Sequence, residues 1–136
     1  MDNAVMRQGE RKWTTFTQSV PRNRIRTVVL WALQLLAAGM FLMSGTLKVT
    51  GVPIMVQMFD AIGVGQWFRY AIGTIELAGA LLLLVPSLAL LGAVLLAATM
   101  GGAVITHLFV IGGSPATALV LLAATATIAW LRRSER

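Results

Sequence analysis

Four long apolar stretches dominate this sequence and restrict its fold more than any other feature. They cover residues 27–47, 70–85, 88–111 and 116–131, and the acidic or basic side chains inside them are Glu76 and His107 alone. A helix needs about 20 apolar residues to cross the hydrocarbon core of a bilayer. The mean hydropathy is +0.81 and only 12% of the residues are charged, which is atypical of a soluble domain. The pattern predicts an all-α, polytopic membrane protein.

The apolar runs and their flanking residues predict a bundle of four transmembrane helices. We expect spans over about residues 27–47, 68–86, 88–111 and 115–131, within a membrane domain of residues 25–136. Residues 1–24 are polar and basic, which is typical of a flexible tail. Trp13, Phe16 and Val20 leave open a short amphipathic contact of this tail with the membrane surface.

The segment between the first two spans predicts a short interfacial helix. Gly51 and Pro53 interrupt the first apolar run, and Gly63 ends the next one. Between Pro53 and Gly63 the apolar residues recur at helical spacing, while Gln57 and Asp60 occupy another side. This segment is too short to span a bilayer and too apolar to lie in water, so we expect it to cap the bundle.

Basic residues predict the orientation in the cell (inner) membrane. Nine of them lie before the first span or after the last, and only Lys48 and Arg69 lie on the opposite side. Because cytoplasmic loops carry the excess of Lys and Arg, we expect both termini in the cytoplasm. The net charge of +6 is therefore a topology signal with some attraction for membrane lipid, and it does not indicate nucleic-acid binding. The first span is too long for a signal peptide and should remain in the mature protein.

Short motifs resemble the DoxX-like family of small four-helix membrane proteins over about residues 27–131. They are the segments 41–48 (FLMSGTLK), 57–59 (QMF), 69–79 (RYAIGTIELAG) and 106–107 (TH). The resemblance implies a four-helix integral membrane fold. It implies several roles, because relatives include subunits linked to quinone-dependent sulfur oxidation, partners of redox-defence enzymes and assembly factors for membrane proteins.

Lys48, Glu76 and His107 are the candidate functional residues, because a charge inside a membrane needs a partner or a purpose. If successive spans are antiparallel, all three lie in the outer half of the bundle. At about 1.5 Å per residue, Glu76 lies about 10 Å below the start of its span and His107 about 7 Å below the end of its own. We expect a ligand pocket beneath the interfacial helix, with further polar groups from Ser44, Gln57, Tyr70 and Thr106.

Each of the three residues also has a purely structural interpretation. Glu76 can pair with Lys48 or bond across helices, His107 can be an interhelical hydrogen-bonder, and Lys48 can anchor a helix end. Gln34, deeper in the first span, is interpreted as an isolated interhelical hydrogen-bonder. One histidine and one glutamate do not complete a metal site, and the absence of cysteine excludes disulfides and thiolate ligands.

Two functional hypotheses remain open, and neither makes the chain an autonomous enzyme. The first is a non-catalytic partner or assembly component of a membrane complex, which binds another membrane protein. The second is a subunit that binds a lipophilic small molecule, with a quinone as the candidate cofactor. A small proton-coupled transporter is a third interpretation, but the carboxylate lies in the second span here and in the first span of small multidrug transporters.

Overall fold

The computed structural model describes residues 22–136 and has four long helices. They are α2 (Arg22–Thr50), α4 (Gln66–Leu84), α5 (Ala89–Thr106) with its π-helical continuation η1 (His107–Ile111), and α6 (Ala116–Arg133). Each of the four is long and apolar enough to cross a membrane. The predicted all-α fold with four spans is therefore confirmed. The predicted tail lies outside the described residues, except that residues 22–24 form the first turn of α2.

The first helix is longer than the uncharged run that predicted it. α2 has 29 residues, which corresponds to about 43 Å at 1.5 Å per residue. This exceeds a hydrocarbon core of about 30 Å. The helix can therefore extend beyond the hydrocarbon core. Its charged residues lie at the two ends that can do so, with Arg22, Arg24 and Arg26 at one and Lys48 at the other.

The short helix between the first two spans is also confirmed. α3 (Pro53–Ile62) begins with a proline in its first turn and ends at Gly63, whose φ of 82° is in the left-handed region. A proline in the first turn costs no backbone hydrogen bond, and glycine adopts positive φ without strain. Phe59 is buried and meets Phe68 of α4 edge to face, with ring centroids 5.8 Å apart. This contact holds α3 across the end of the bundle.

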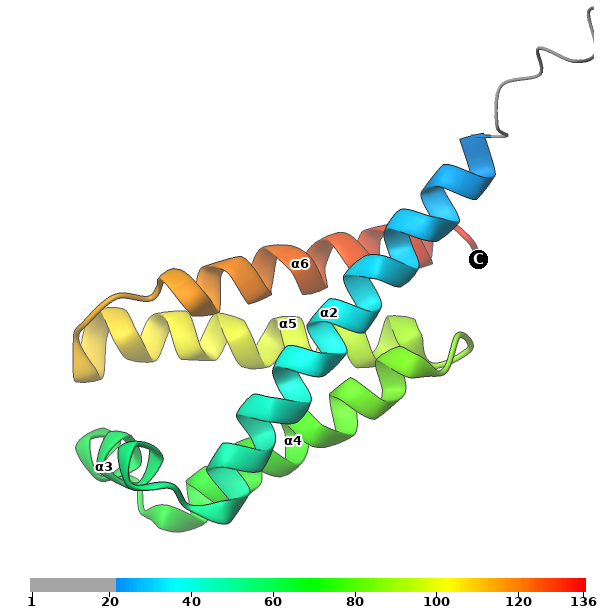
Figure 1. The fold of residues 1–136 in the computed structure, drawn as a ribbon. Helices are drawn as coiled ribbons and strands as arrows, with labels where there is room; N and C mark the ends of the chain where they lie inside the picture. Colours follow the sequence, from blue (N-terminus) through cyan, green and yellow to red (C-terminus); the bar gives the residue numbers. More distant parts are fainter. Residues whose placement is uncertain (1–21) are drawn as a thin grey trace, which may run out of the picture.

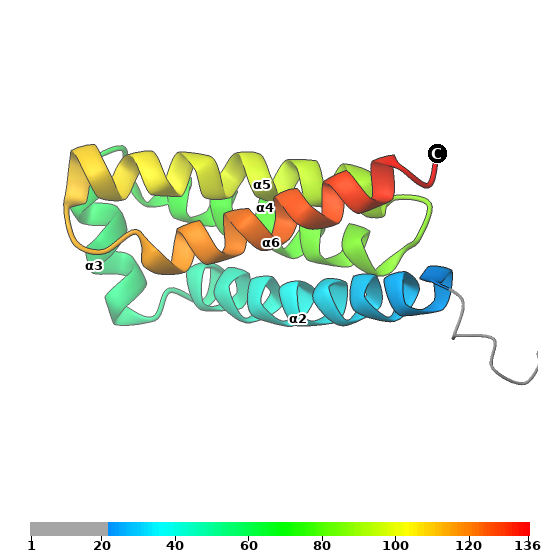
Figure 2. The same cartoon turned by 90° about the horizontal axis from the view of Figure 1, so that it is seen from above.

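Neighbouring helices are antiparallel, as the short connections predict. α4 packs against both α2 and α5, and α5 packs against α6, while α2 and α6 make fewer contacts. Figure 2 shows the start of α2 and the C-terminus at one end of the bundle, with α3 at the other. We call the end that carries α3 the capped end.

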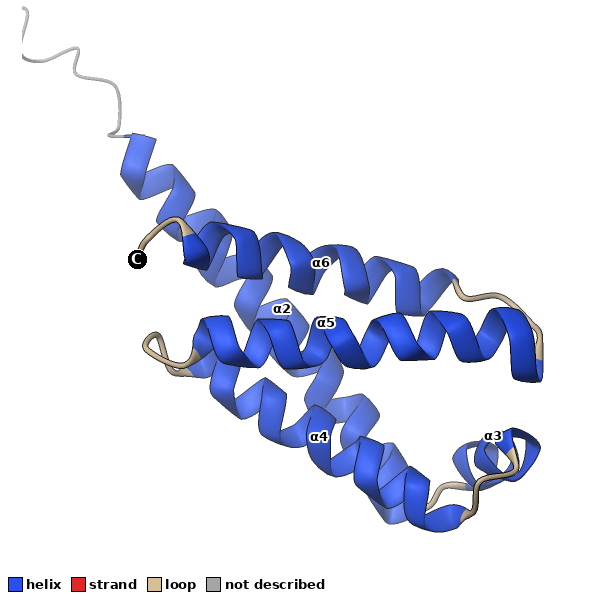
Figure 3. Ribbon diagram, turned by 180° about the vertical axis from the view of Figure 1, so that it is seen from behind, coloured by secondary structure: helices blue, strands red, loops and turns tan. Residues whose placement is uncertain are grey.

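α4 and α5 approach closely at the level of Gly79 and Gly92 and separate toward the capped end. A Cβ atom on Gly92 of α5 would lie 2.8 Å from the Gly79 carbonyl oxygen of α4, so only glycine allows this contact. Almost three turns further along α5, a Cβ atom on Gly102 would meet nothing within 4 Å. In Figures 1 and 3 the α5–α6 pair accordingly diverges from α2 and α4, and α3 lies at the open side.

Candidate functional site

Two glycines bring Lys48 and Glu76 together. Cβ atoms on Gly45 and on Gly73 would each lie about 3 Å from the other residue's carbonyl oxygen (2.8 and 3.1 Å), so α2 and α4 touch backbone to backbone. Small residues allow such close approach in membrane helices. Lys48 and Glu76 each follow their glycine by three residues, which is almost one helical turn. The long lysine side chain therefore reaches the carboxylate.

The spacing of Gly73, Glu76 and Gly79 directs the carboxylate between two neighbouring helices. Two residues that are three positions apart in a helix lie about 60° apart around the helix axis. Gly73 contacts α2, and Gly79 contacts Leu96 of α5, where an added Cβ would lie 2.6 Å from the leucine Cγ. Glu76 falls between these directions and points into the space between α2 and α5.

Lys48 and Glu76 form a buried ion pair. The Lys48 Nζ lies 3.0 Å from Glu76 Oε2, and the exposed fractions of the two side chains are 12% and 1%. Lys48 also donates to Ser44 Oγ at 2.6 Å, one turn earlier on α2. Among residues 22–136, no side chain or backbone group forms a hydrogen bond with the second carboxylate oxygen, Oε1. Lys48 thus satisfies one side of the carboxylate and leaves the other open.

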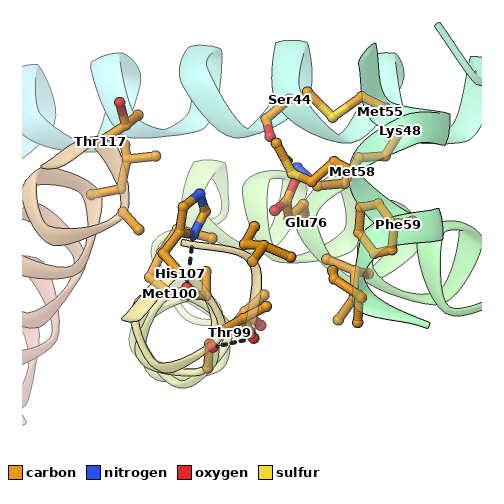
Figure 4. A pocket seen from close by; sticks show the side chains of 18 of the residues that line it. Ser44, Lys48, Met55, Met58, Phe59, Glu76, Thr99, Met100, His107 and Thr117 are labelled. Atoms are coloured by element: carbon orange, nitrogen blue, oxygen red, sulfur yellow. Dashed lines mark hydrogen bonds and ion pairs between the residues drawn. The ribbon is translucent and has the colours of Figure 1, made fainter. Parts of the chain in front are cut away.

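His107 lies where α5 changes to π-helical geometry. Its Nδ1 is 2.9 Å from the carbonyl oxygen of Ala103. A carbonyl only accepts, so Nδ1 carries a hydrogen, and Nε2 of the neutral ring is an acceptor. Figure 4 shows this second nitrogen on the side of the ring away from α5, facing the space beneath α2. Single π-turns within helices occur often at functional sites.

A cavity of about 640 Å³ joins these side chains. Its wall is mostly apolar, with Met55, Met58, Phe59 and Ile62 from α3 closing the capped end and Met100 of α5 on another side. Its polar lining residues are Ser44, Lys48, Glu76, Thr99, Thr106, His107, Ser114 and Thr117. The cavity occupies the region where α5 and α6 diverge from α2 and α4.

Five of the seven pocket residues proposed from the sequence line this cavity, and two do not. Ser44, Lys48, Glu76, Thr106 and His107 belong to the wall. Gln57 is exposed on the outer side of α3. Tyr70 is 49% exposed, and the Arg69 guanidinium lies 4.2 Å from its ring centroid.

Four polar residues in or near the cavity were not singled out from the sequence as site residues: Thr99, Ser114 and Thr117 of its wall, and Arg69, which contacts Lys48. Thr99 lines the wall two turns before His107, and this helical spacing is the signal that could have found it. Arg69 is buried, donates to the Lys48 carbonyl oxygen, and donates from Nε to Gln66 Oε1 at 2.7 Å. A guanidinium at a helix C-terminus satisfies free carbonyl groups, so Arg69 ties the end of α2 to the start of α4.

Gln34 takes part in a polar network far from the cavity and is not isolated, contrary to its interpretation from the sequence. Its Nε2 donates to the carbonyl oxygen of Leu83 in α4 at 2.5 Å. Arg132 of α6 donates from Nε to Gln34 Oε1 at 2.7 Å, and its guanidinium lies 5.6 Å from the ring centroid of Trp31. The network links α2, α4 and α6 at the uncapped end.

The cavity offers binding groups but no recognisable catalytic set. Within residues 22–136, no three histidine, aspartate or glutamate side chains are grouped so as to hold a metal ion. The wall combines a large apolar area with one carboxylate, one ammonium and one imidazole, which is typical of small-molecule sites.

The fold and cavity define a small polytopic membrane protein with an open pocket between its helices near one end of the bundle. The model of the DoxX-like family matches residues 32–131, more than half of the 136-residue chain, and the protein belongs to this family. Neither curated proteins nor solved structures gave a match.

Proposed function

We propose that the protein binds a lipophilic molecule in the cavity, with the polar head of the molecule near Glu76 and His107. The observation that carries the proposal is the cavity itself, about 640 Å³ in volume and lined by both side chains. Small-molecule sites have volumes of about 300–1,000 Å³ and a few polar groups in an apolar wall. The lining of this cavity fits that description.

A purely structural role for the ion pair does not account for the cavity beside it. Lys48 and Glu76 could satisfy each other if the helices around them were closely packed. Here the open carboxylate oxygen and His107 Nε2 border a cleft of about 640 Å³ that opens to the outside of the bundle, since Ala98, Gly102 and Thr117 of its wall are exposed. A molecule with an apolar body would fill the space, and its head would meet the polar groups.

A quinone and a membrane lipid both belong to this class of molecule, and the protein is proposed to bind such a molecule without converting it. The lining supplies no second carboxylate or imidazole for catalysis. Any redox step would therefore be carried out by the bound molecule and a partner.

The proposed topology places both termini in the cytoplasm and the cavity in the outer half of the cell (inner) membrane. Basic residues cluster at the uncapped end, which includes Arg132, Arg133 and Arg136. At the capped end, Lys48 is paired with Glu76 and Arg69 is buried. Because both of these cations serve internal contacts, the capped end presents little free positive charge, which supports its assignment to the outer side.

A second candidate function is that of a partner or assembly component, and one surface favours it. α6 exposes Ala116, Ala123, Ala126 and Thr127, and small residues let another membrane helix approach closely. The chain has no cysteine, so Ala123→Cys creates a single crosslinking site. Crosslinking of Ala123→Cys in native membranes to one defined membrane protein would support this function. Crosslinking only to lipid would argue against it.

Two neighbouring glycines provide a matched test of the lipophilic-ligand function. Gly102 lines the cavity and Gly101 does not, yet an added Cβ meets open space at both positions. Gly102→Leu should fill part of the cavity and reduce the lipophilic molecules that co-purify with the protein, as measured by mass spectrometry of a solvent extract. Gly101→Leu should leave them unchanged. His107→Leu should also reduce retention while the helical circular dichroism stays constant. Equal retention by all three variants would refute the proposed function.

A further inference from the structure

The hydrogen-bonding groups of the cavity also restrict the chemistry of the head group. Resting on the proposed function, we infer that the cavity selects lipophilic molecules whose head donates a hydrogen bond, such as a hydroxyl, over analogues that only accept. The inference follows from where the hydrogen atoms of the lining residues are already used.

The wall formed by α5 and η1 accepts hydrogen bonds but has no donor to offer. The Thr99 hydroxyl donates to the Leu95 carbonyl oxygen at 2.9 Å, and the Thr106 hydroxyl donates to that of Gly102 at 2.8 Å. A hydroxyl has one hydrogen and two lone pairs, so both oxygens retain only acceptor capacity toward the cavity.

His107 fits the same pattern. Its Nδ1 hydrogen is used on the Ala103 carbonyl oxygen at 2.9 Å, so the neutral ring presents Nε2 as an acceptor. All three polar side chains of this wall can therefore only accept a hydrogen bond from a bound molecule. A ketone, ether or ester oxygen placed against Nε2 would meet another acceptor and leave both groups unpaired.

The opposite side of the cavity, which includes Lys48 and Glu76, can both donate and accept hydrogen bonds. Glu76 Oε1 is an acceptor without a partner among the described residues, while Lys48 uses two of its three ammonium hydrogens on Ser44 Oγ and Glu76 Oε2. A head with a hydroxyl facing His107 can bond to Nε2 and still use either group opposite. A head that only accepts finds donors in Lys48 and in the hydroxyls of Ser44, Ser114 and Thr117, but none on the wall formed by α5 and η1.

A pair of probes that differ in one hydrogen-bond donor tests the inference. 4-Octylphenol and its methyl ether, 4-octylanisole, share the same apolar body, but only the phenol donates. Binding of each to the purified full-length protein in nanodiscs is measured by equilibrium dialysis, with empty nanodiscs subtracted. We expect the phenol to bind about tenfold more tightly, because the ether leaves a buried acceptor unpaired.

A variant and a control assign the preference to His107. His107→Phe keeps a ring of similar shape without an acceptor, so the two probes should bind with nearly equal affinity. His107→Gln keeps an acceptor and should restore part of the preference. Gln57→Ala, at an exposed position outside the cavity, should leave it unchanged.

The outcomes separate this inference from the proposed function. Equal affinities for the two probes in the unaltered protein would overturn the inference and leave the pocket intact. A phenol preference that persists in His107→Phe would overturn the assignment to His107, because another acceptor of the cavity, such as Glu76 Oε1, would then account for it. Binding of neither probe would overturn the proposed function and the inference together.

Discussion

Replacing Glu76 by glutamine should destabilise the bundle through the ammonium group of Lys48. The pair is 3.0 Å long, and the carboxylate side chain is 1% exposed. At an effective dielectric constant of about 20, two unit charges at this distance attract by about 5.5 kcal/mol before desolvation is counted. Breaking a buried pair on one side typically costs about 3–5 kcal/mol. Because Lys48 is at a helix end and keeps its bond to Ser44, we expect about 3 kcal/mol for Glu76→Gln.

The double variant distinguishes pairing from two separate roles. Combining Glu76→Gln with Lys48→Met removes the stranded charge and should recover about 2 kcal/mol relative to the sum of the single losses. The free energy of unfolding is measured by titrating the protein with sodium dodecyl sulfate in mixed micelles and following circular dichroism. Glu135→Gln is the matched control. Its 2.9 Å pair with Arg132 is more open to water, because the Glu135 side chain is 36% exposed while Arg132, like Lys48, is 12% exposed, so its loss should cost under about 1 kcal/mol. Additive losses for Glu76 and Lys48 would refute the reasoning.

Three further predictions concern packing. Gly92→Ala should destabilise the bundle by about 1–3 kcal/mol, because its Cβ would meet backbone atoms of α4 at 2.8–2.9 Å. Gly101→Ala, in open space, should be neutral or stabilising. Equal effects of the two changes in mixed-micelle unfolding would contradict the close contact of α4 with α5 at Gly92. Gln34→Leu should cost about 2 kcal/mol in the same assay, because it leaves Arg132 Nε without its acceptor; an unchanged stability would show that the network contributes nothing. Phe59→Ala should speed backbone hydrogen exchange in α3 without changing the helical content, and unchanged exchange would show that other contacts hold α3.

The spans and the depth of the candidate residues could be predicted because both depend on the sequence along one helix at a time. Hydropathy locates a span, and the rise per residue gives the depth of Glu76 and of His107. Arg69 could not be assigned in this way, because its burial depends on the Lys48 carbonyl that α2 presents to it.

The direction of a side chain round its helix was harder to predict. The positions of Gln57 and Tyr70 along the chain suit the pocket, but they do not determine the direction of each side chain around its helix axis. For Gln57 the hydropathy pattern of α3 already contained the direction. The apolar face, with Met55, Met58 and Phe59, faces the cavity, and Gln57 lies on another side of the helix. The cavity itself arises from the divergence of two helix pairs, which depends on contacts between helices such as that of Gly92 with Gly79.

Photolabelling with an octanol that carries a diazirine tests the central claim most directly, because the label reports where a lipophilic molecule with a hydroxyl head resides. The protein in nanodiscs is irradiated, digested and mapped by mass spectrometry. The account predicts labels on Met55, Met58 and Ala98, which line the cavity, and their loss in Gly102→Leu. Labels confined to outward residues such as Leu35 and Leu36, which are 57% and 70% exposed, would contradict it.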